Sequence, residues 1–239
     1  MTITKHLSRR NLLQASGIAA LTATVTACAA IPMPQPVMAP EAPVANADEA
    51  LQRLLDGNKR YVANKSTSLN ESASRRVEVA KAQHPFATIF SCVDSRVPPE
   101  LVFDRGLGDL FVIRTAGHVI DNAVMGSLEY GVAELKIPLL MVMGHEKCGA
   151  VKATIETLEK HGEAPDQIEA LVKGIEPAVE KVKAQAGDML TNAVHENTAL
   201  TVARLMASPI LGEAVAKGQL KIVGGCYALD TGVVEMLKA

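Results

Sequence analysis

The sequence has no tryptophan and few other aromatic residues. Of its 239 residues, three are tyrosine and four are phenylalanine, whereas 48% are hydrophobic. A core without large rings must be built from aliphatic side chains and alanine, a composition that favours helices packed on a sheet. The chain also has no internal repeat, and its length suits one sizeable domain with appendages.

The sequence also lacks an excess of charge of either sign. Lysine and arginine number 24 and aspartate and glutamate 26, a formal net charge of −2. The first 47 residues hold three basic residues and one acidic residue, which leaves −4 for the remainder. A mildly acidic domain without a basic stripe or clustered aromatics argues against nucleic acid as a partner.

The first apolar run is too short for a comfortable membrane span. It covers sixteen residues, Leu12 to Ala27, and follows a basic start that contains Lys5. Ser8-Arg9-Arg10-Asn11 carries the twin arginine of the bacterial route that exports folded proteins. We therefore expect residues 1–28 to be an export signal, and the protein to be periplasmic or anchored in the membrane facing the periplasm.

Cys28 leaves three readings open. Val25-Thr26-Ala27-Cys28 resembles the bacterial lipobox, whose cysteine is lipidated and would tether the chain to the membrane. Ordinary cleavage near Ala27-Cys28-Ala29 and an uncleaved anchor are the alternatives. Residues 29–47 contain five prolines, so we expect a semi-rigid linker there and a folded domain at 48–239.

The folded part alternates short apolar runs with helical patterns after two opening helices. Runs buried on both faces and alternating with helices predict an α/β fold with a mostly parallel central sheet flanked by helices. The predicted strands are Ala87–Ser91, Leu110–Arg114, Leu139–Met143 and Leu220–Cys226. The predicted helices are Asp48–Ala63, capped by Asp48, then Glu71–Ala82, Asn122–Glu134, Cys148–Leu158, Asp166–Lys183, Met189–Met206 and Ile210–Lys217.

Two of these strands end directly in motifs that carry chemistry. Cys92-Val93-Asp94-Ser95-Arg96 follows the first strand and is closed by Pro98-Pro99, and His145-Glu146-Lys147-Cys148 follows the third. In extended backbone, Cys92, Asp94 and Arg96 would share one face. Functional groups often gather at the carboxyl ends of parallel strands, so we expect the two motifs to meet.

Cys92, His145 and Cys148 together make a donor set that suits zinc. Two thiolates and one imidazole leave a fourth tetrahedral position for water. Cys148 at a helix start would have its thiolate stabilised by the helix dipole. Asp94, held by Arg96, would accept a hydrogen bond from the bound water or hydroxide and so fix which lone pair is free to attack.

Each residue has a simpler interpretation when taken alone. Cys92 could be a buried small hydrophobe, His145 a surface or core histidine, and Asp94–Arg96 a structural salt bridge. Export to an oxidising compartment makes a disulfide another alternative for the cysteines. The placement of both motifs at strand ends favours the metal site.

The paired motifs resemble the β-class carbonic anhydrases. Cys-x-Asp-Ser-Arg followed about fifty residues later by His-x-x-Cys-Gly is specific to them, and the similarity runs from about Gln83 to Val234. The resemblance implies one zinc ion per chain on Cys92, His145 and Cys148, with Asp94 and Arg96 as a catalytic dyad. It also implies a substrate pocket of Gln83, Phe111, Tyr130 and Gly149, with Phe111 and Tyr130 contributed across a dimer interface.

The activity that this resemblance implies is reversible hydration of CO2 to bicarbonate and a proton through zinc-bound hydroxide, in a homodimer or higher homo-oligomer. Carbonyl sulfide or carbon disulfide hydrolysis on the same scaffold is an alternative, as is a non-catalytic, zinc-bound bicarbonate sensor. The absence of tryptophan and the presence of Ile89 predict the subgroup whose site is always open. His118 is a candidate proton shuttle, although a loop histidine without a special role is the expectation. We expect Cys226 to be a buried thiol and His84, His161 and His195 to lie on the surface.

Overall fold

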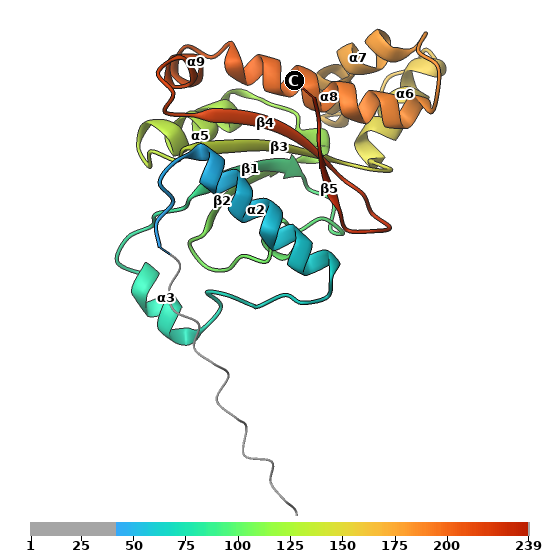
Figure 1. The fold of residues 1–239 in the computed structure, drawn as a ribbon. Helices are drawn as coiled ribbons and strands as arrows, with labels where there is room; N and C mark the ends of the chain where they lie inside the picture. Colours follow the sequence, from blue (N-terminus) through green and yellow to red (C-terminus); the bar gives the residue numbers. More distant parts are fainter. Residues whose placement is uncertain (1–41, 239) are drawn as a thin grey trace, which may run out of the picture. The chain divides into compact units, whose positions relative to one another are not determined.

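The computed structural model describes residues 42–238 and contains one five-stranded sheet. The export signal predicted for residues 1–28, with Cys28, and most of the predicted linker lie outside the described residues. The strand order is β2-β1-β3-β4-β5 (Figure 1). The first four strands pair in parallel and β5 pairs antiparallel with β4, so the predicted mostly parallel sheet is confirmed. The strands are β1 Ala87–Cys92, β2 Leu110–Thr115, β3 Leu139–His145, β4 Lys221–Tyr227 and β5 Val234–Met236.

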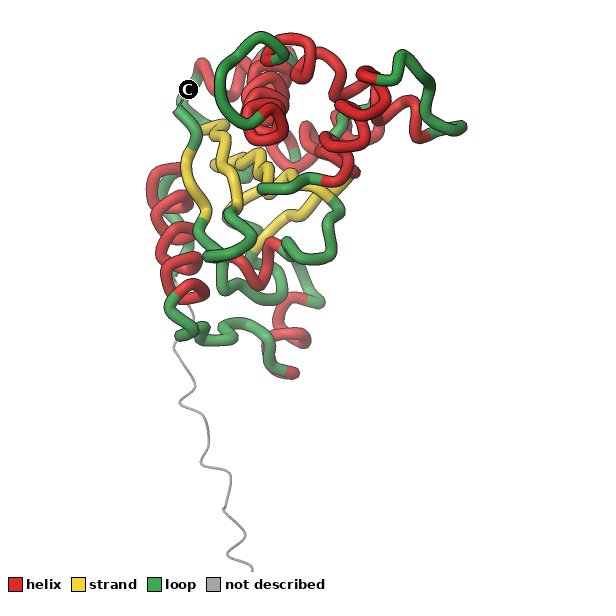
Figure 2. The backbone as a smooth tube through the Cα atoms, turned by 90° about the vertical axis from the view of Figure 1, so that its right-hand side faces the viewer, coloured by secondary structure: helices red, strands yellow, loops and turns green. Residues whose placement is uncertain are grey.

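Helices cover both faces of this sheet, as the view turned by 90° shows (Figure 2). Alternate residues of β3 serve the two faces: Met141 packs in one core with Leu54 of α2, and Val142 packs in another with Leu128 of α5. Because both faces are buried, the strand reads as a continuous apolar run. The helices that supply these two cores are α2 Ala47–Val62, α5 Asn122–Ala133, α8 Met189–Met206 and α9 Pro209–Ala216.

A third core lies at the carboxyl end of the parallel strands. Here α6 (Gly149–Glu159), α7 (Ile168–Val182) and α8 pack together around Cys92 and Cys148. Within residues 42–238, no single helix is long and apolar enough to cross a membrane; α8 and α9 pass that test only as a pair, bent by 85°. The third core surrounds the point where the two sequence motifs meet.

The first two predicted helices begin at other residues than expected. Asn46, not Asp48, caps α2, because its side chain accepts a hydrogen bond from the backbone N–H of Glu49. The second predicted helix is shorter, with α3 at Ala73–Val79, because Ser72 caps it. Asp48 instead lies in the first turn of α2, where an acidic side chain interacts favourably with the helix dipole.

Three short elements are absent from the sequence prediction. β1 ends at Cys92, before the Pro98-Pro99 pair, and Pro99 begins α4 (Pro99–Val102), because proline is tolerated in a first helical turn. The 3₁₀ turn η1 (Ala116–His118) and the three-residue strand β5 are too short to produce a periodic pattern. The turn η1 lies directly beyond the end of β2, next to the motif that follows β1.

Candidate active site

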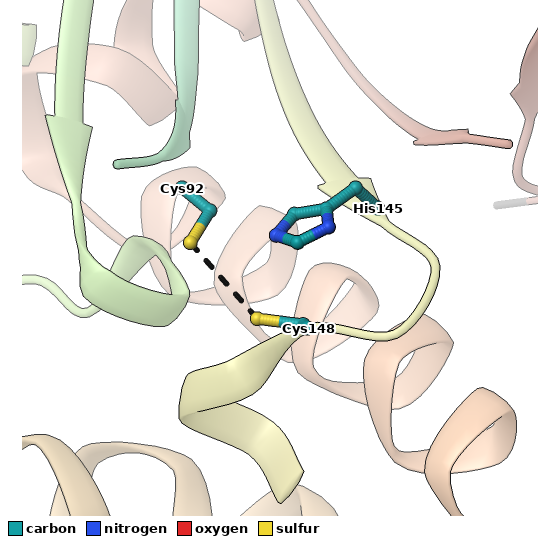
Figure 3. A group of neighbouring side chains, drawn as sticks. All are labelled: Cys92, His145 and Cys148. Atoms are coloured by element: carbon teal, nitrogen blue, oxygen red, sulfur yellow. Dashed lines mark hydrogen bonds between the residues drawn. The ribbon is translucent and has the colours of Figure 1, made fainter. Parts of the chain in front are cut away.

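Cys92, His145 and Cys148 converge at the carboxyl edge of the sheet, as the sequence predicts (Figure 3). Cys92 and His145 are the last residues of the neighbouring parallel strands β1 and β3, and Cys148 is the N-cap residue of α6. Their ligand atoms all lie within 4.8 Å of one another, and all three residues are buried. Cys92 and Gly144, the residue before His145, are 52 positions apart in the chain. Parallel strands that end at one edge nevertheless bring Cys92 and His145 together.

The imidazole of His145 is oriented for a metal ion. Its Nδ1–H donates a hydrogen bond of 2.8 Å to the carbonyl oxygen of Glu146, which leaves the lone pair on Nε2. Nε2 is buried and has no hydrogen-bond partner among the described residues. A buried polar atom without a partner costs about 1–3 kcal/mol, so the position favours a bound ligand at Nε2.

The two thiols complete a donor set that zinc fits. Cys92 Sγ and Cys148 Sγ are 3.9 Å apart and both cysteines are free, so the disulfide alternative is wrong for this pair. The contact with Cys148 is the main cause that lowers the pKa of Cys92; His145 and the backbone N–H of Gly117, 3.3 Å from the sulfur, lower it further. Two sulfur donors and one nitrogen donor leave one tetrahedral position open.

Asp94 and Arg96 form the predicted pair beside this cluster. Arg96 donates from Nε to Asp94 Oδ1 at 3.0 Å and from Nη2 to Oδ2 at 2.7 Å. These hydrogen bonds are the main cause that lowers the pKa of Asp94 to about 2, so the carboxylate is ionised at neutral pH. Asp94 Oδ2 lies 3.8 Å from His145 Nε2, which places the carboxylate at the edge of the ligand cluster.

The backbone route to this pair differs from the prediction. An extended chain does not carry Arg96 to the face of Cys92, because the backbone turns after Asp94. Asp94 Oδ1 accepts the N–H of Arg96 at 2.9 Å, and the Asp94 carbonyl accepts the N–H of Val97 at 3.1 Å. Arg96 therefore reaches Asp94 by folding back over the turn.

Arg114 is a residue of the site to which the sequence prediction gave no role. From β2 its guanidinium donates to the carbonyl oxygens of Cys92 at 2.9 Å, Asp94 at 2.6 Å and Val97 at 3.2 Å. It thus fixes the loop that carries the predicted dyad. An arginine in a predicted strand next to a ligand strand is the signal that could have identified it.

The residues predicted to bind substrate do not all reach the cluster within one chain. Gly149, the first residue of α6, is exposed and follows Cys148 directly. Phe111 and Tyr130 lie together with ring centroids 6.4 Å apart, but Phe111 pairs with Thr88, four residues before Cys92 or roughly 13 Å along the strand. Gln83 is exposed and precedes β1, at the opposite end of that strand from Cys92.

The remaining histidines and Cys226 follow the prediction with one exception. His84, His161 and His195 are exposed, and Cys226 is a buried free thiol. His118 is buried, at 2% exposure, and burial lowers its pKa to about 4. A proton shuttle exchanges protons with solvent, so this position, in the buried 3₁₀ turn η1, does not support that role.

Comparisons with known proteins agree on the family. The family model described as carbonic anhydrase matches residues 87–234. A carbonic anhydrase of Mycolicibacterium smegmatis is 42% identical over 196 residues, covering 81% of this chain and 95% of the relative. Carbonic anhydrase 2 of Mycobacterium tuberculosis is 40% identical over 194 residues, covering 80% and 92%. The solved Coccomyxa β-carbonic anhydrase, in complex with acetazolamide, shares 29% identity with a TM-score of 0.61, covering 81% of this chain and 87% of that one.

The ligand cluster lies wholly within the matched segment, on the strands and helix that the fold places there. The chain therefore belongs to the β class of the carbonic anhydrase family, zinc enzymes that interconvert carbon dioxide and bicarbonate.

Proposed function

We propose that Asp94 is the catalytic carboxylate of reversible CO2 hydration in this chain, acting beside one zinc ion held by Cys92, His145 and Cys148. One observation carries this assignment: the ionised Asp94 carboxylate lies 3.8 Å from the free Nε2 of His145. An ionised carboxylate only accepts hydrogen bonds. Asp94 therefore holds the O–H of an attacking water toward itself and directs an oxygen lone pair at the carbon of CO2.

The other residues of the site maintain this arrangement. Arg96 keeps Asp94 ionised and fixes the plane of its carboxylate through two parallel hydrogen bonds. Arg114 holds the backbone on both sides of Asp94. Cys92, His145 and Cys148 would hold the zinc ion, which would lower the pKa of a bound water and so supply a nucleophile near neutral pH. The proton released in each turnover leaves to buffer, and water replaces bicarbonate.

The substrate pocket requires a second copy of the chain. Tyr130 on α5 is 48% exposed although its ring contacts Phe111, and both lie far along the sheet from the ligands of their own chain. Gln83 lies at the amino end of β1, so it too can reach a ligand cluster only on a partner. We infer a homodimer or higher homo-oligomer in which these side chains form dry walls and a hydrogen-bond donor for CO2.

The proposed location is the periplasm, with a tether at Cys28. The twin arginine at Arg9-Arg10 and the short apolar run support export, and the lipobox-like residues before Cys28 support lipidation. Fractionation of cells expressing the full chain tests both. The full chain should partition with membranes and Cys28→Ser should be soluble in the periplasm; an equal distribution of the two proteins would contradict the tether.

Asp94→Asn tests the proposed role of Asp94. The amide keeps the shape of the carboxylate but loses its charge and one acceptor, so we expect zinc binding to remain and CO2 hydration to fall by about 100-fold or more. The measurements are zinc per chain and stopped-flow hydration with a pH indicator. Asp230→Asn is the matched control. Within residues 42–238, the exposed carboxylate of Asp230 makes side-chain contacts with Lys147 alone. Near-normal turnover by Asp94→Asn would refute the assignment.

A further inference from the structure

The turn η1 holds two consecutive residues in the left-handed region. Gly117 has φ of +60° and His118 has φ of +45°. Glycine is needed at position 117 for space as well, since a Cβ there would lie 2.5 Å from Ile175 Cδ1. This conformation is uncommon for a residue with a side chain, although histidine tolerates it better than most, so hydrogen bonds from a neighbouring element favour it at His118. The turn is therefore held from outside.

This turn makes a direct contact with the ligand cluster. The backbone N–H of Gly117 points at Cys92 Sγ, with nitrogen and sulfur 3.3 Å apart, and both residues are buried. The N–H lies in the plane of the Ala116–Gly117 peptide unit, so its direction relative to the turn is set by the φ angle of Gly117, +60°. A change in the turn would thus be transmitted to the sulfur.

Asn197 is the group that holds the turn. It lies on α8, is 5% exposed, and its Nδ2 is 2.9 Å from the carbonyl oxygen of Gly117 and 2.9 Å from Nε2 of His118. The two hydrogens of one amide nitrogen serve the two acceptors. Burial keeps the His118 imidazole neutral, which allows Nε2 to accept, with the proton on Nδ1. One side chain therefore fastens both residues of the turn to a helix that is 79 and 80 positions away in sequence.

We propose that Asn197 is a positioning residue for the zinc ligand Cys92, acting through the turn at Gly117 and His118. By holding the turn, it aims the N–H of Gly117 at Cys92 Sγ, which fixes the direction of the sulfur lone pairs and reduces the electron donation of the thiolate to a metal. Hydrogen bonds to ligand atoms tune metal sites in this way. The inference rests on the metal site used by the proposed function but not on the role of Asp94, and its test reads metal binding rather than turnover.

The test is Asn197→Leu, which keeps a similar size and removes both donors. We expect zinc affinity, measured by chelator competition, to fall about 10- to 100-fold, because the loss of a fixed sulfur position outweighs the stronger donation of the freed thiolate. We also expect the thiolate-to-metal charge-transfer band of the cobalt-substituted protein to move to lower energy, because a thiolate that loses a hydrogen bond donates more strongly. Asn197→Ala provides the same test without a branched side chain if the leucine variant does not fold, and each variant is measured only on protein with parental circular dichroism.

Thr198→Val is the matched control. Thr198 is the next residue of α8 and is buried, but within residues 42–238 its hydroxyl donates only to the Val194 carbonyl of its own helix. The Thr198→Val variant should keep parental zinc affinity and an unshifted charge-transfer band. That result would separate the positioning effect from a general loosening of α8. Parental affinity and band position in a folded Asn197 variant would overturn the proposal, as would an equal effect of Thr198→Val.

Discussion

His145 illustrates how a single backbone contact decides the chemistry of a side chain. Donation from Nδ1 to the Glu146 carbonyl leaves Nε2 as an acceptor in a buried place, where only a ligand such as a metal ion satisfies it. The sequence motif predicts which residues bind, but it contains no information on tautomer. The same holds for Arg114, whose contacts with three carbonyl oxygens follow from the fold.

Cys148→Ala tests the ligand set at this scale. Loss of one of three protein ligands should leave the purified protein with far less than one zinc per chain and no measurable hydration activity, because two ligands hold zinc much more weakly. Metal analysis and stopped-flow assays give both results. Cys226→Ala is the control: it removes another buried thiol, one outside the cluster, and should retain zinc. Stoichiometric zinc in Cys148→Ala would contradict the ligand set.

At the scale of the elements, the strongest patterns in the sequence predicted the structure best. The run at Leu139–Met143 is buried on both faces, and α8 has the predicted bounds of Met189–Met206. The three missed elements, α4, η1 and β5, contain only three or four residues each, too few to produce a periodic pattern in the sequence. One of them, η1, touches Cys92, so a part of the site could not be predicted from local sequence.

At the scale of the whole molecule, one chain provides the metal cluster and the dyad but not the predicted substrate walls. The parallel sheet gathers at one edge the groups that follow β1 and β3, whereas Phe111 and Tyr130 lie further back on β2 and α5. Spacing along the chain predicted the ligands, which share an edge, whereas the pocket was expected only from the family resemblance. A pocket between copies depends on an interface that sequence patterns do not describe.

Tyr130→Glu tests this assembly. A charge placed where a half-exposed ring is proposed to meet a partner should disrupt the oligomer, so we expect a smaller species by light scattering, zinc retained, and hydration reduced about 10-fold or more. Ile168→Glu is the control, because Ile168 is similarly exposed at the start of α7 and away from the proposed pocket. If Tyr130→Glu kept both the oligomer and full activity, Tyr130 would not lie at a subunit interface that forms the pocket.

The central claim is that Cys92, His145 and Cys148 hold a zinc ion that makes this chain a carbonic anhydrase. The most direct measurement is stopped-flow CO2 hydration by the purified chain before zinc removal, after removal with a chelator, and after zinc is restored. The account predicts rapid proton release that disappears with the metal and returns with it. A folded protein with one zinc per chain and no hydration above the buffer rate would contradict it.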